Sequence, residues 1–279
     1  WGTSAAELHE TAVMGALNAV EAAHAAGVRR MVLTSSSVTL GSSNQTVPLD
    51  ETSQSDDPNA PDYYRSKIDQ ERATMARARE LGVDLVVVCP GIVVGPYDYR
   101  LSPSNGILLA YWDDVLATTW PGGINLVYAD DVAKGHLLAA KKGNNGERYF
   151  LGSENLEWSL VHRIIAELSG LSPPRVMANH TTCYLAAAAM EATARFTGKP
   201  PRTTREQARQ VGRFYWYTHE KAAKLGYSPR PARQALAETI AWMLVQSPHV
   251  SRALRARLSP SREVMRAREQ FLGEKEVSR

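Results

Sequence analysis

The sequence has little cysteine and no metal-binding motif, which excludes several kinds of site. Its 279 residues contain only two cysteines, Cys89 and Cys183, which are far apart and outside any C-x-x-C spacing. This pattern argues against a disulfide framework or a thiolate metal site. The seven histidines form no H-E-x-x-H motif, so we expect no metal. Cys89 lies in an apolar run, where a free thiol serves as a small core residue.

The sequence also lacks a strong charge of one sign and a long apolar run. A net charge of +3 spread along the chain offers no basic groove for nucleic acid. No stretch approaches the roughly 18 continuous apolar residues that cross a bilayer, and the start lacks the pattern of a secretory signal. We therefore expect a cytoplasmic protein that acts on a small-molecule substrate, without a nucleic-acid partner or a membrane span.

Helical and strand patterns alternate over the first two thirds of the chain. Apolar residues at helical spacing predict helices over 5–26 and 63–81, each followed by a glycine stop. The β-branched runs at 29–38 and 83–96 predict strands buried on both faces. The alternation continues with a strand and helix at 124–140, a strand at 146–152 and a helix at 158–170. This order predicts a doubly wound, Rossmann-like parallel α/β sheet.

The chain changes character after Pro173 and Pro174. We predict a Rossmann-like core over 1–172, a smaller, mainly helical substrate lobe over 173–250, and a basic tail over 251–279. The tail contains seven Arg, one Lys and four Glu, so 8 minus 4 gives +4, more than the net charge of the whole chain. A solvated, partly frayed helix explains this composition, and binding to a partner or an anionic surface is the alternative.

The stretch "YYRSK" places Tyr63 and Lys67 four residues apart in a predicted helix. Residues at this spacing lie on one face about 5 to 6 Å apart, so both side chains can point into one cavity. A neighbouring ammonium favours the phenolate and would lower the pKa of Tyr63, which would make it a usable acid or base. Lys67 could also hold a ribose hydroxyl. Y-x-x-x-K is a common spacing, so two unrelated surface residues are the alternative.

Hydroxyl groups follow the first predicted strand, in "MVLTSSSV". Open α/β sheets bind their ligands at the carboxyl ends of strands. Ser36 lies at this position and could donate a hydrogen bond to the same substrate oxygen that Tyr63 would protonate. The sequence therefore predicts a Ser-Tyr-Lys site with Ser36, Tyr63 and Lys67 as its catalytic residues.

Five ordered stretches make the sequence resemble the extended short-chain dehydrogenase/reductase superfamily, also called the NAD-dependent epimerase/dehydratase family. They are "AVMGALNAVEAAHAAGVRRMVLTSSS", "YYRSK", "PGIVVGP", "LVYADDVAKGHLLA" and "KAAKLGYSPRPARQALAETIAWM". The resemblance is strongest to dihydroflavonol-reductase-like and hopanoid-associated epimerase-like members. It implies NAD or NADP as cofactor, the same Ser-Tyr-Lys roles, and a homodimer as one possible assembly.

The resemblance also implies roles for other residues. Thr34, Tyr63 and Lys67 would contact the cofactor, together with the segment against the nicotinamide, Pro90, Gly91, Ile92 and Val93. Substrate contacts would come from Ser37, Tyr97, Ser104 and Asn105. Ser37 follows Ser36 where nucleotide-sugar 4,6-dehydratases have an acid, which disfavours dehydratase chemistry. The Asn of the superfamily's tetrad corresponds to Ala12, so the proton relay would differ or pass through water.

The sequence contains no G-x-x-G-x-x-G turn, which members of this superfamily use to cradle the pyrophosphate. "WGTSAAELHE" corresponds to the segment after the family's fourth strand. We expect that the given sequence is a fragment or that the glycine-rich half lies elsewhere. A relative that no longer binds dinucleotide is the alternative.

Three further groups have ordinary explanations. Asp130 and Asp131 precede a predicted helix and are expected as an N-cap and a first-turn acid. The aromatic run from Phe214 to Tyr217 is expected in the core of the lobe, with base stacking as the alternative. His136 lies in an apolar helical run and is expected to be packed.

The function predicted from these residues is NAD(P)-dependent reduction of a carbonyl, or oxidation of a secondary alcohol. A sugar-nucleotide epimerase that keeps its NAD bound is the alternative within enzymes. A dinucleotide-free scaffold is the alternative outside them. The sequence indicates neither the substrate nor the choice between NAD and NADP.

Overall fold

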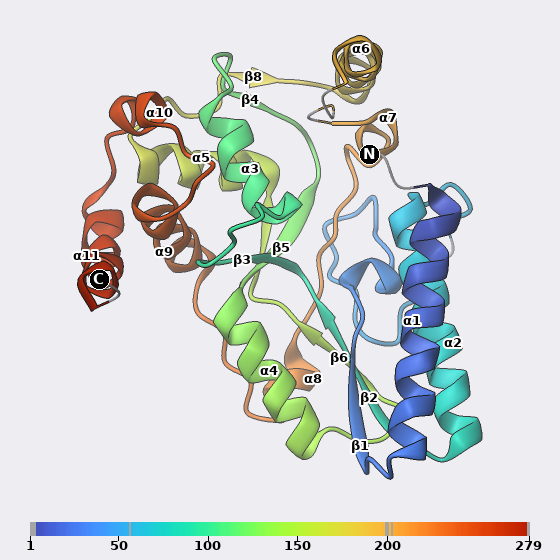
Figure 1. The fold of residues 1–279 in the computed structure, drawn as a ribbon. Helices are drawn as coiled ribbons and strands as arrows, with labels where there is room; N and C mark the ends of the chain where they lie inside the picture. Colours follow the sequence, from blue (N-terminus) through green and yellow to red (C-terminus); the bar gives the residue numbers. More distant parts are fainter. Residues whose placement is uncertain (1–3, 56, 199–200, 202, 278–279) are drawn as a thin grey trace.

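The computed structural model of the protein describes residues 4–55, 57–198, 201 and 203–277 (Figure 1). Two long helices, α1 (Ala5–Ala25) and α2 (Asp62–Leu81), lie side by side along one edge of the molecule. A capping box between Ser4 and Glu7 starts α1. Gly82, at φ 67°, ends α2 in the left-handed conformation that glycine adopts without strain. Both predicted helices are confirmed.

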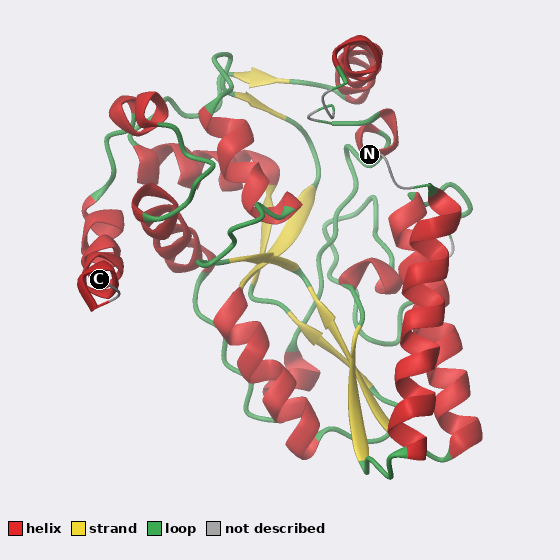
Figure 2. Ribbon diagram, viewed as in Figure 1, coloured by secondary structure: helices red, strands yellow, loops and turns green. Residues whose placement is uncertain are grey.

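Three strands form the first sheet in the order β1-β2-β6, and all of them are parallel. They are β1 (Arg30–Thr34), β2 (Asp84–Pro90) and β6 (Arg148–Leu151). The α1–α2 pair covers one face and α4 (Ala129–Lys142) covers the other, as Figure 2 shows. The central strand β2 is therefore buried on both sides, with Val86, Val87, Val88 and Cys89 fully inaccessible. The predicted doubly wound arrangement and the core position of Cys89 are confirmed.

The chain enters a second sheet at Ile92, two positions after β2 ends at Pro90. This sheet has the order β3-β5-β7, with β3 (Ile92–Val94) parallel to β5 (Gly123–Tyr128) and β7 (Glu154–Glu157) antiparallel to it. The single strand predicted over 83–96 is thus wrong, because the chain leaves one sheet at Gly91 and enters the other. A Cβ atom at Gly91 would lie 2.8 Å from the Asn125 backbone oxygen, so only glycine allows this close crossing.

The remaining elements are shorter and mostly helical. In chain order they are η1 (Ser37–Leu40), α3 (Pro103–Trp112), β4 (Thr118–Thr119), α5 (Trp158–Ser169), β8 (Val176–Met177), α6 (His180–Thr197), α7 (Arg205–Ala208), α8 (Glu220–Ala223), α9 (Ala232–Val245), α10 (Arg252–Arg257) and α11 (Arg262–Val277). Within the predicted helical lobe, α7 is only a single turn. None of the helices within the described ranges is long and apolar enough to cross a membrane.

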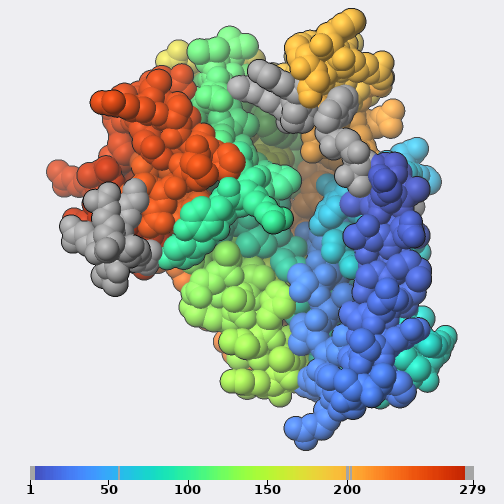
Figure 3. Space-filling model, viewed as in Figure 1, coloured from blue at the N-terminus to red at the C-terminus, as the bar shows by residue number. Residues whose placement is uncertain are grey.

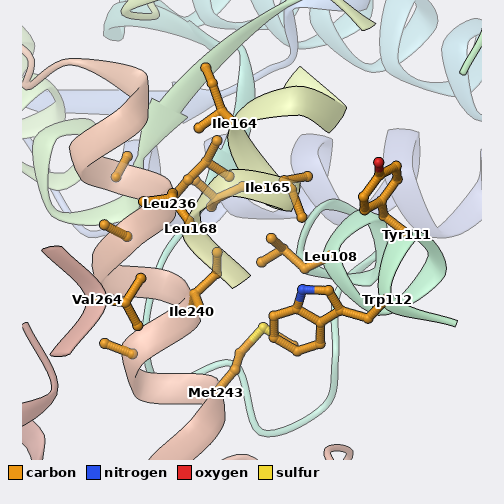
Figure 4. Packing of buried hydrophobic residues seen from close by; sticks show 14 of the residues in the cluster. Leu108, Tyr111, Trp112, Ile164, Ile165, Leu168, Leu236, Ile240, Met243 and Val264 are labelled. Carbon is orange, nitrogen blue, oxygen red and sulfur yellow. The ribbon is translucent and has the colours of Figure 1, made fainter. Parts of the chain in front are cut away.

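The largest hydrophobic cluster joins the second sheet to the C-terminal helices (Figure 4). Ile165 of α5 and Ile240 of α9 are fully buried in it. Val264 and Phe271 of α11 belong to the same cluster and are 0% and 1% exposed. The described part of the basic tail is therefore anchored and not frayed, because its apolar face packs on α9. Figure 3 shows these C-terminal helices on the side of the molecule opposite α1.

The aromatic run from Phe214 to Tyr217 reaches the first sheet through its last residue. The Tyr217 ring lies 4.7 Å from the Phe150 ring of β6, and Tyr217 is 2% exposed. Its hydroxyl donates to the Gly41 carbonyl at 2.6 Å. Tyr217 is therefore core, but it belongs to the β1-β2-β6 cluster, whereas the Trp216 indole nitrogen donates to the Leu156 carbonyl of β7 in the second sheet.

His162 of α5 is a buried base, and we predict that it makes the fold sensitive to acid. It stacks on Tyr111 and lies beside Trp120 and Trp158, and its Nδ1 is 3.0 Å from the Thr119 hydroxyl. Burial lowers the pKa of His162 to about 4. The unfolded state therefore binds a proton more readily, so stability is complete above about pH 6.5 and decreases as the pH falls toward 4.

The expected loss between these pH values is at most about 3 kcal/mol of unfolding free energy. Urea unfolding at a series of pH values measures it. The variant His162→Phe keeps an aromatic ring in the stack but cannot titrate, and it should lose this part of the pH dependence. An unchanged slope in the variant would assign the acid sensitivity to other groups.

Candidate active site

Ser36 stands at the carboxyl end of β1, where the chain turns into the 3-10 helix η1. It is the N-cap of η1 and has extended dihedrals of φ −153° and ψ 151°. Its hydroxyl accepts a hydrogen bond from the Val38 amide at 3.4 Å. The residue is half-buried, so its hydroxyl can also serve a group that approaches the end of the sheet.

Tyr63 and Lys67 lie one turn apart in the first part of α2, which packs against η1. The side chain of Ser36 lies close enough to the Tyr63 phenol to oppose the rise in its pKa, so the serine and tyrosine predicted from the sequence are near each other. Lys67 is half-buried, and its ammonium donates to the Gln70 side-chain oxygen at 2.8 Å. One strand end and one helix turn thus carry the three predicted catalytic groups.

The pKa values differ from the sequence-based expectation. Burial raises the pKa of Tyr63, and the nearby side chain of Ser36 opposes this effect only in part. The ring is 45% exposed, so the desolvation comes from the protein that surrounds its hydroxyl end. Burial also lowers the pKa of the Lys67 ammonium. The expected lowering of the tyrosine pKa by Lys67 is therefore wrong here: Tyr63 keeps its proton at neutral pH and is suited to act as an acid.

Glu71 holds the serine segment against α2, and the sequence analysis missed it. Its carboxylate accepts hydrogen bonds from the hydroxyls of Ser35 and Thr39, the second at 2.8 Å. These two residues flank Ser36, whereas Glu71 follows Lys67 by one helical turn. The Glu71 contacts therefore fix β1 and η1 relative to the helix that carries Tyr63 and Lys67. An acid four residues after Lys67, on the same helix face, was the available signal.

Arg148 of β6 completes this buried cluster. Its guanidinium is 3.1 Å from the Glu71 carboxylate, with the two side chains 11% and 7% exposed. It also donates to the backbone oxygens of Glu51 and Ser53. A cavity of about 110 Å³ lies beside this ion pair. Ser36, Tyr63 and Lys67 do not line the cavity, so we do not assign it to the reaction.

The residues predicted to contact the cofactor surround the ends of the two neighbouring strands. Thr34 pairs with Val88 across β1 and β2, so Thr34 and Pro90 end adjacent strands. The Thr34 hydroxyl lies 2.9 Å from Nε2 of His136, whose Nδ1 donates to a backbone carbonyl of α4. His136 is thus hydrogen-bonded between two elements. Ile92 and Val93 are half-buried against separate core clusters.

Two of the predicted substrate contacts have structural roles in this fold. Ser37 is 7% exposed and interacts with the buried Tyr217. Asn105 is 2% exposed, and its amide donates to the Gly95 carbonyl at 2.8 Å and accepts from the Gly95 amide at 3.3 Å. It therefore ties α3 to the end of β3. Both side chains are buried and engaged inside the protein, and their contact with substrate stays a prediction.

The other two predicted substrate contacts, Tyr97 and Ser104, lie in the segment between β3 and α3. Tyr97 has φ 65° and is 50% exposed. Its ring lies 6.2 Å from Trp242 of α9 and 6.3 Å from Phe271 of α11. Ser104 is half-buried in the first turn of α3. Contact of these two residues with substrate stays a prediction.

Asp130 and Asp131 both lie in the first turn of α4, as expected, but neither is its N-cap. That position belongs to Tyr128, which makes no side-chain capping bond. Asp131 is buried and accepts from Arg230 at 3.0 Å, and the Arg230 guanidinium lies 3.8 Å from the centre of the Tyr128 ring. Arg230 therefore joins α4 to the start of α9, which explains the acid without a catalytic role.

A parallel sheet covered by helices, with a serine at a strand's carboxyl end and a tyrosine and lysine on the adjoining helix, is an α/β arrangement in which ligands bind at the carboxyl ends of the strands. The family model of the NAD dependent epimerase/dehydratase family matches residues 1–152. The chain belongs to this family. The resemblance seen in the sequence, the Rossmann-type fold and the class of enzyme, an NAD(P)-dependent oxidoreductase, are thereby confirmed.

Similar proteins cover most of the chain. A putative dihydroflavonol 4-reductase of Synechocystis sp. is 28% identical over 248 residues, which is 87% of this chain and 72% of that protein. Sterol demethylase protein B of Methylococcus capsulatus is 28% identical over 248 residues, which is 85% of this chain and 73% of that protein. The crystal structure of gox2253 superposes with a TM-score of 0.74 at 33% identity, covering 87% of this chain and 74% of that one.

The described residues fit the nicotinamide end of such a dinucleotide. The Lys67 ammonium donates to Gln70 and forms no ion pair within the part of the chain that the structure describes, so further N–H donors are free for a ribose hydroxyl. Tyr63 is partly exposed beside it. The sequence offers no glycine-rich turn for the phosphates. Tyr63, Lys67 and the backbone around Gly91 are the groups that would hold the nicotinamide ribose.

Proposed function

We propose that this protein reduces a carbonyl group of a small organic molecule with NAD(P)H, and oxidises the corresponding secondary alcohol in reverse, through Ser36, Tyr63 and Lys67. The observation that carries the proposal is the proximity of Ser36, at the end of β1, to Tyr63 on α2, which packs against η1. A protonated phenol and a serine hydroxyl that lie near each other can both donate hydrogen bonds to a single substrate oxygen.

Each residue would have a separate task. Tyr63, which is protonated at neutral pH, donates its proton to the carbonyl oxygen. Ser36 donates a hydrogen bond to the same oxygen and stabilises the charge that develops there. Lys67 holds a ribose hydroxyl, and its positive charge stabilises the negative charge left on Tyr63 after proton transfer. A bound nicotinamide dinucleotide supplies the hydride.

The names of similar proteins support reduction over isomerisation. Beside the putative dihydroflavonol 4-reductase, they include cinnamoyl-CoA reductase 1 of Petunia hybrida at 26% identity and 2-alkyl-3-oxoalkanoate reductase of Stenotrophomonas maltophilia at 29%. All three names describe the reduction of an oxygenated carbon. We infer that the substrate carries a ketone or thioester carbonyl beside an apolar body.

The test is net consumption of NADPH or NADH, followed at 340 nm, with dihydroflavonols, 3-oxo acids and their thioesters as probes. We expect oxidation of one dinucleotide by at least one probe, and a loss of about a hundredfold in kcat for Ser36→Ala because one donor to the developing oxyanion is removed. Equal rates for the two proteins would remove Ser36 from the mechanism.

The same experiment separates the alternatives. A nucleoside-diphosphate-sugar epimerase from Pseudomonas aeruginosa shares the fold, with a TM-score of 0.67 at 23% identity. Isomerisation of a nucleotide sugar without net change in NAD would favour the epimerase. Failure of the complete gene product to bind either dinucleotide would favour a scaffold. Either result would overturn the proposed reductase.

A further inference from the structure

Gln70 makes an unusual connection between the site and the neighbouring helix. The Lys67 ammonium donates to the Gln70 side-chain oxygen at 2.8 Å, and the nitrogen of the same amide donates to the backbone oxygen of Ala12 at 3.1 Å. One side chain thus uses its acceptor on Lys67 and a donor on α1. Its orientation is fixed, because the reversed amide would place NH₂ against an ammonium.

A neutral amide oxygen suits a lysine whose positive charge must stay uncompensated. A lysine ammonium sits on a flexible four-carbon stem and needs an acceptor to hold one orientation. A carboxylate in the place of Gln70 would form an ion pair and compensate the charge, whereas a neutral amide oxygen orients the ammonium and leaves the charge in place. Nearby titratable groups already have partners: His9 lies 3.0 Å from Asp69, and Glu71 is paired with Arg148.

We propose that Gln70 is a positioning residue, which holds the Lys67 ammonium in one orientation by linking it to the Ala12 carbonyl of α1. The role of Lys67 in this statement rests on the proposed function. The sequence resemblance places Ala12 where the superfamily has its tetrad Asn, and the Gln70 amide spans the gap from that backbone position to the lysine.

The test measures Lys67 itself and needs no substrate. Lysine labelled with ¹³C at Cε is incorporated, the Lys67 resonance is assigned by its absence in Lys67→Met, and its titration is followed by NMR. Gln70→Leu keeps the bulk but removes the acceptor, so the Lys67 titration should move to lower pH. Gln70→Glu adds a negative charge, so it should move to higher pH.

Arg77→Leu is the matched control. The Arg77 guanidinium lies 3.0 Å from Glu21, so this variant also removes a polar contact between α1 and α2, but at a distance from Lys67 along the helix. It should leave the Lys67 titration unchanged. Shifts of opposite sign in the two Gln70 variants and none in the control support the proposal. Identical titration in all variants, or equal shifts in Gln70→Leu and Arg77→Leu, would overturn it.

The result does not depend on turnover. If no carbonyl probe is reduced but the Lys67 titration responds as expected, the proposed reaction fails and the positioning by Gln70 stands. If reduction is observed but Lys67 does not respond to Gln70, the reaction stands and the positioning fails. The two proposals can therefore be rejected separately.

Discussion

Tyr63→Phe should lower kcat by about 10²- to 10⁴-fold, because it removes the group that donates the proton to the substrate oxygen. The ring and its contact with Tyr64, at 6.1 Å between centroids, are retained, so the fold should be unaffected. Steady-state rates with the probe that wild type reduces give the measurement. Circular dichroism and the unfolding midpoint show whether the variant is folded.

The neighbouring Tyr64→Phe provides the control. Tyr64 is on the same turn of α2, but its ring packs on Tyr215 at 6.0 Å, and it lines a small pocket with Gln210 and Tyr215. Removing its hydroxyl should change kcat by no more than a few-fold. If Tyr63→Phe keeps a tenth or more of the wild-type turnover, or if both variants lose activity equally, Tyr63 is not the acid.

Glu71→Ala should reduce the free energy of unfolding by about 3–5 kcal/mol, because it leaves the buried Arg148 guanidinium without its carboxylate. The hydroxyls of Ser35 and Thr39 lose their acceptor in the same change. Urea denaturation followed by circular dichroism measures the difference. Arg148→Leu combined with Glu71→Leu should recover much of the loss, since no unpaired charge then remains.

The exposed pair between Arg77 and Glu21 is again the comparison. Its side chains are 36% and 53% exposed, and Arg77→Leu should cost less than about 1 kcal/mol. If Glu71→Ala costs no more stability than Arg77→Leu, water reaches the Glu71 cluster, and the cluster does not brace Ser36. A large loss in stability with normal turnover in the folded fraction would confine Glu71 to a structural role.

Local patterns in the sequence were sufficient for the elements that obey them. The helical periods of α1 and α2 and their glycine stops are properties of neighbouring residues, and so is the four-residue spacing of Tyr63 and Lys67. The position of Ser36 beyond β1 followed from the rule that ligands bind at the carboxyl ends of parallel strands. These predictions required no knowledge of distant contacts.

The features that the sequence did not reveal depend on distant partners. Glu71 meets Arg148 across 77 positions, and Asp131 meets Arg230 across 99. The pKa of Tyr63 was predicted in the wrong direction because spacing shows a neighbouring charge but not the burial that outweighs it. Asn105 was predicted as a substrate contact. Its hydrogen bond to Gly95 depends on how α3 docks on β3, which local sequence does not show.

The crossing at Gly91 has a consequence for protein engineering. The two sheets meet where a Cβ atom at position 91 would lie 2.8 Å from the Asn125 backbone oxygen, so a methyl group there would force them apart. Libraries aimed at a new substrate should therefore leave this position invariant and place diversity elsewhere, for example at Tyr97, which is 50% exposed. The two sheets then keep their mutual geometry while recognition evolves beside them.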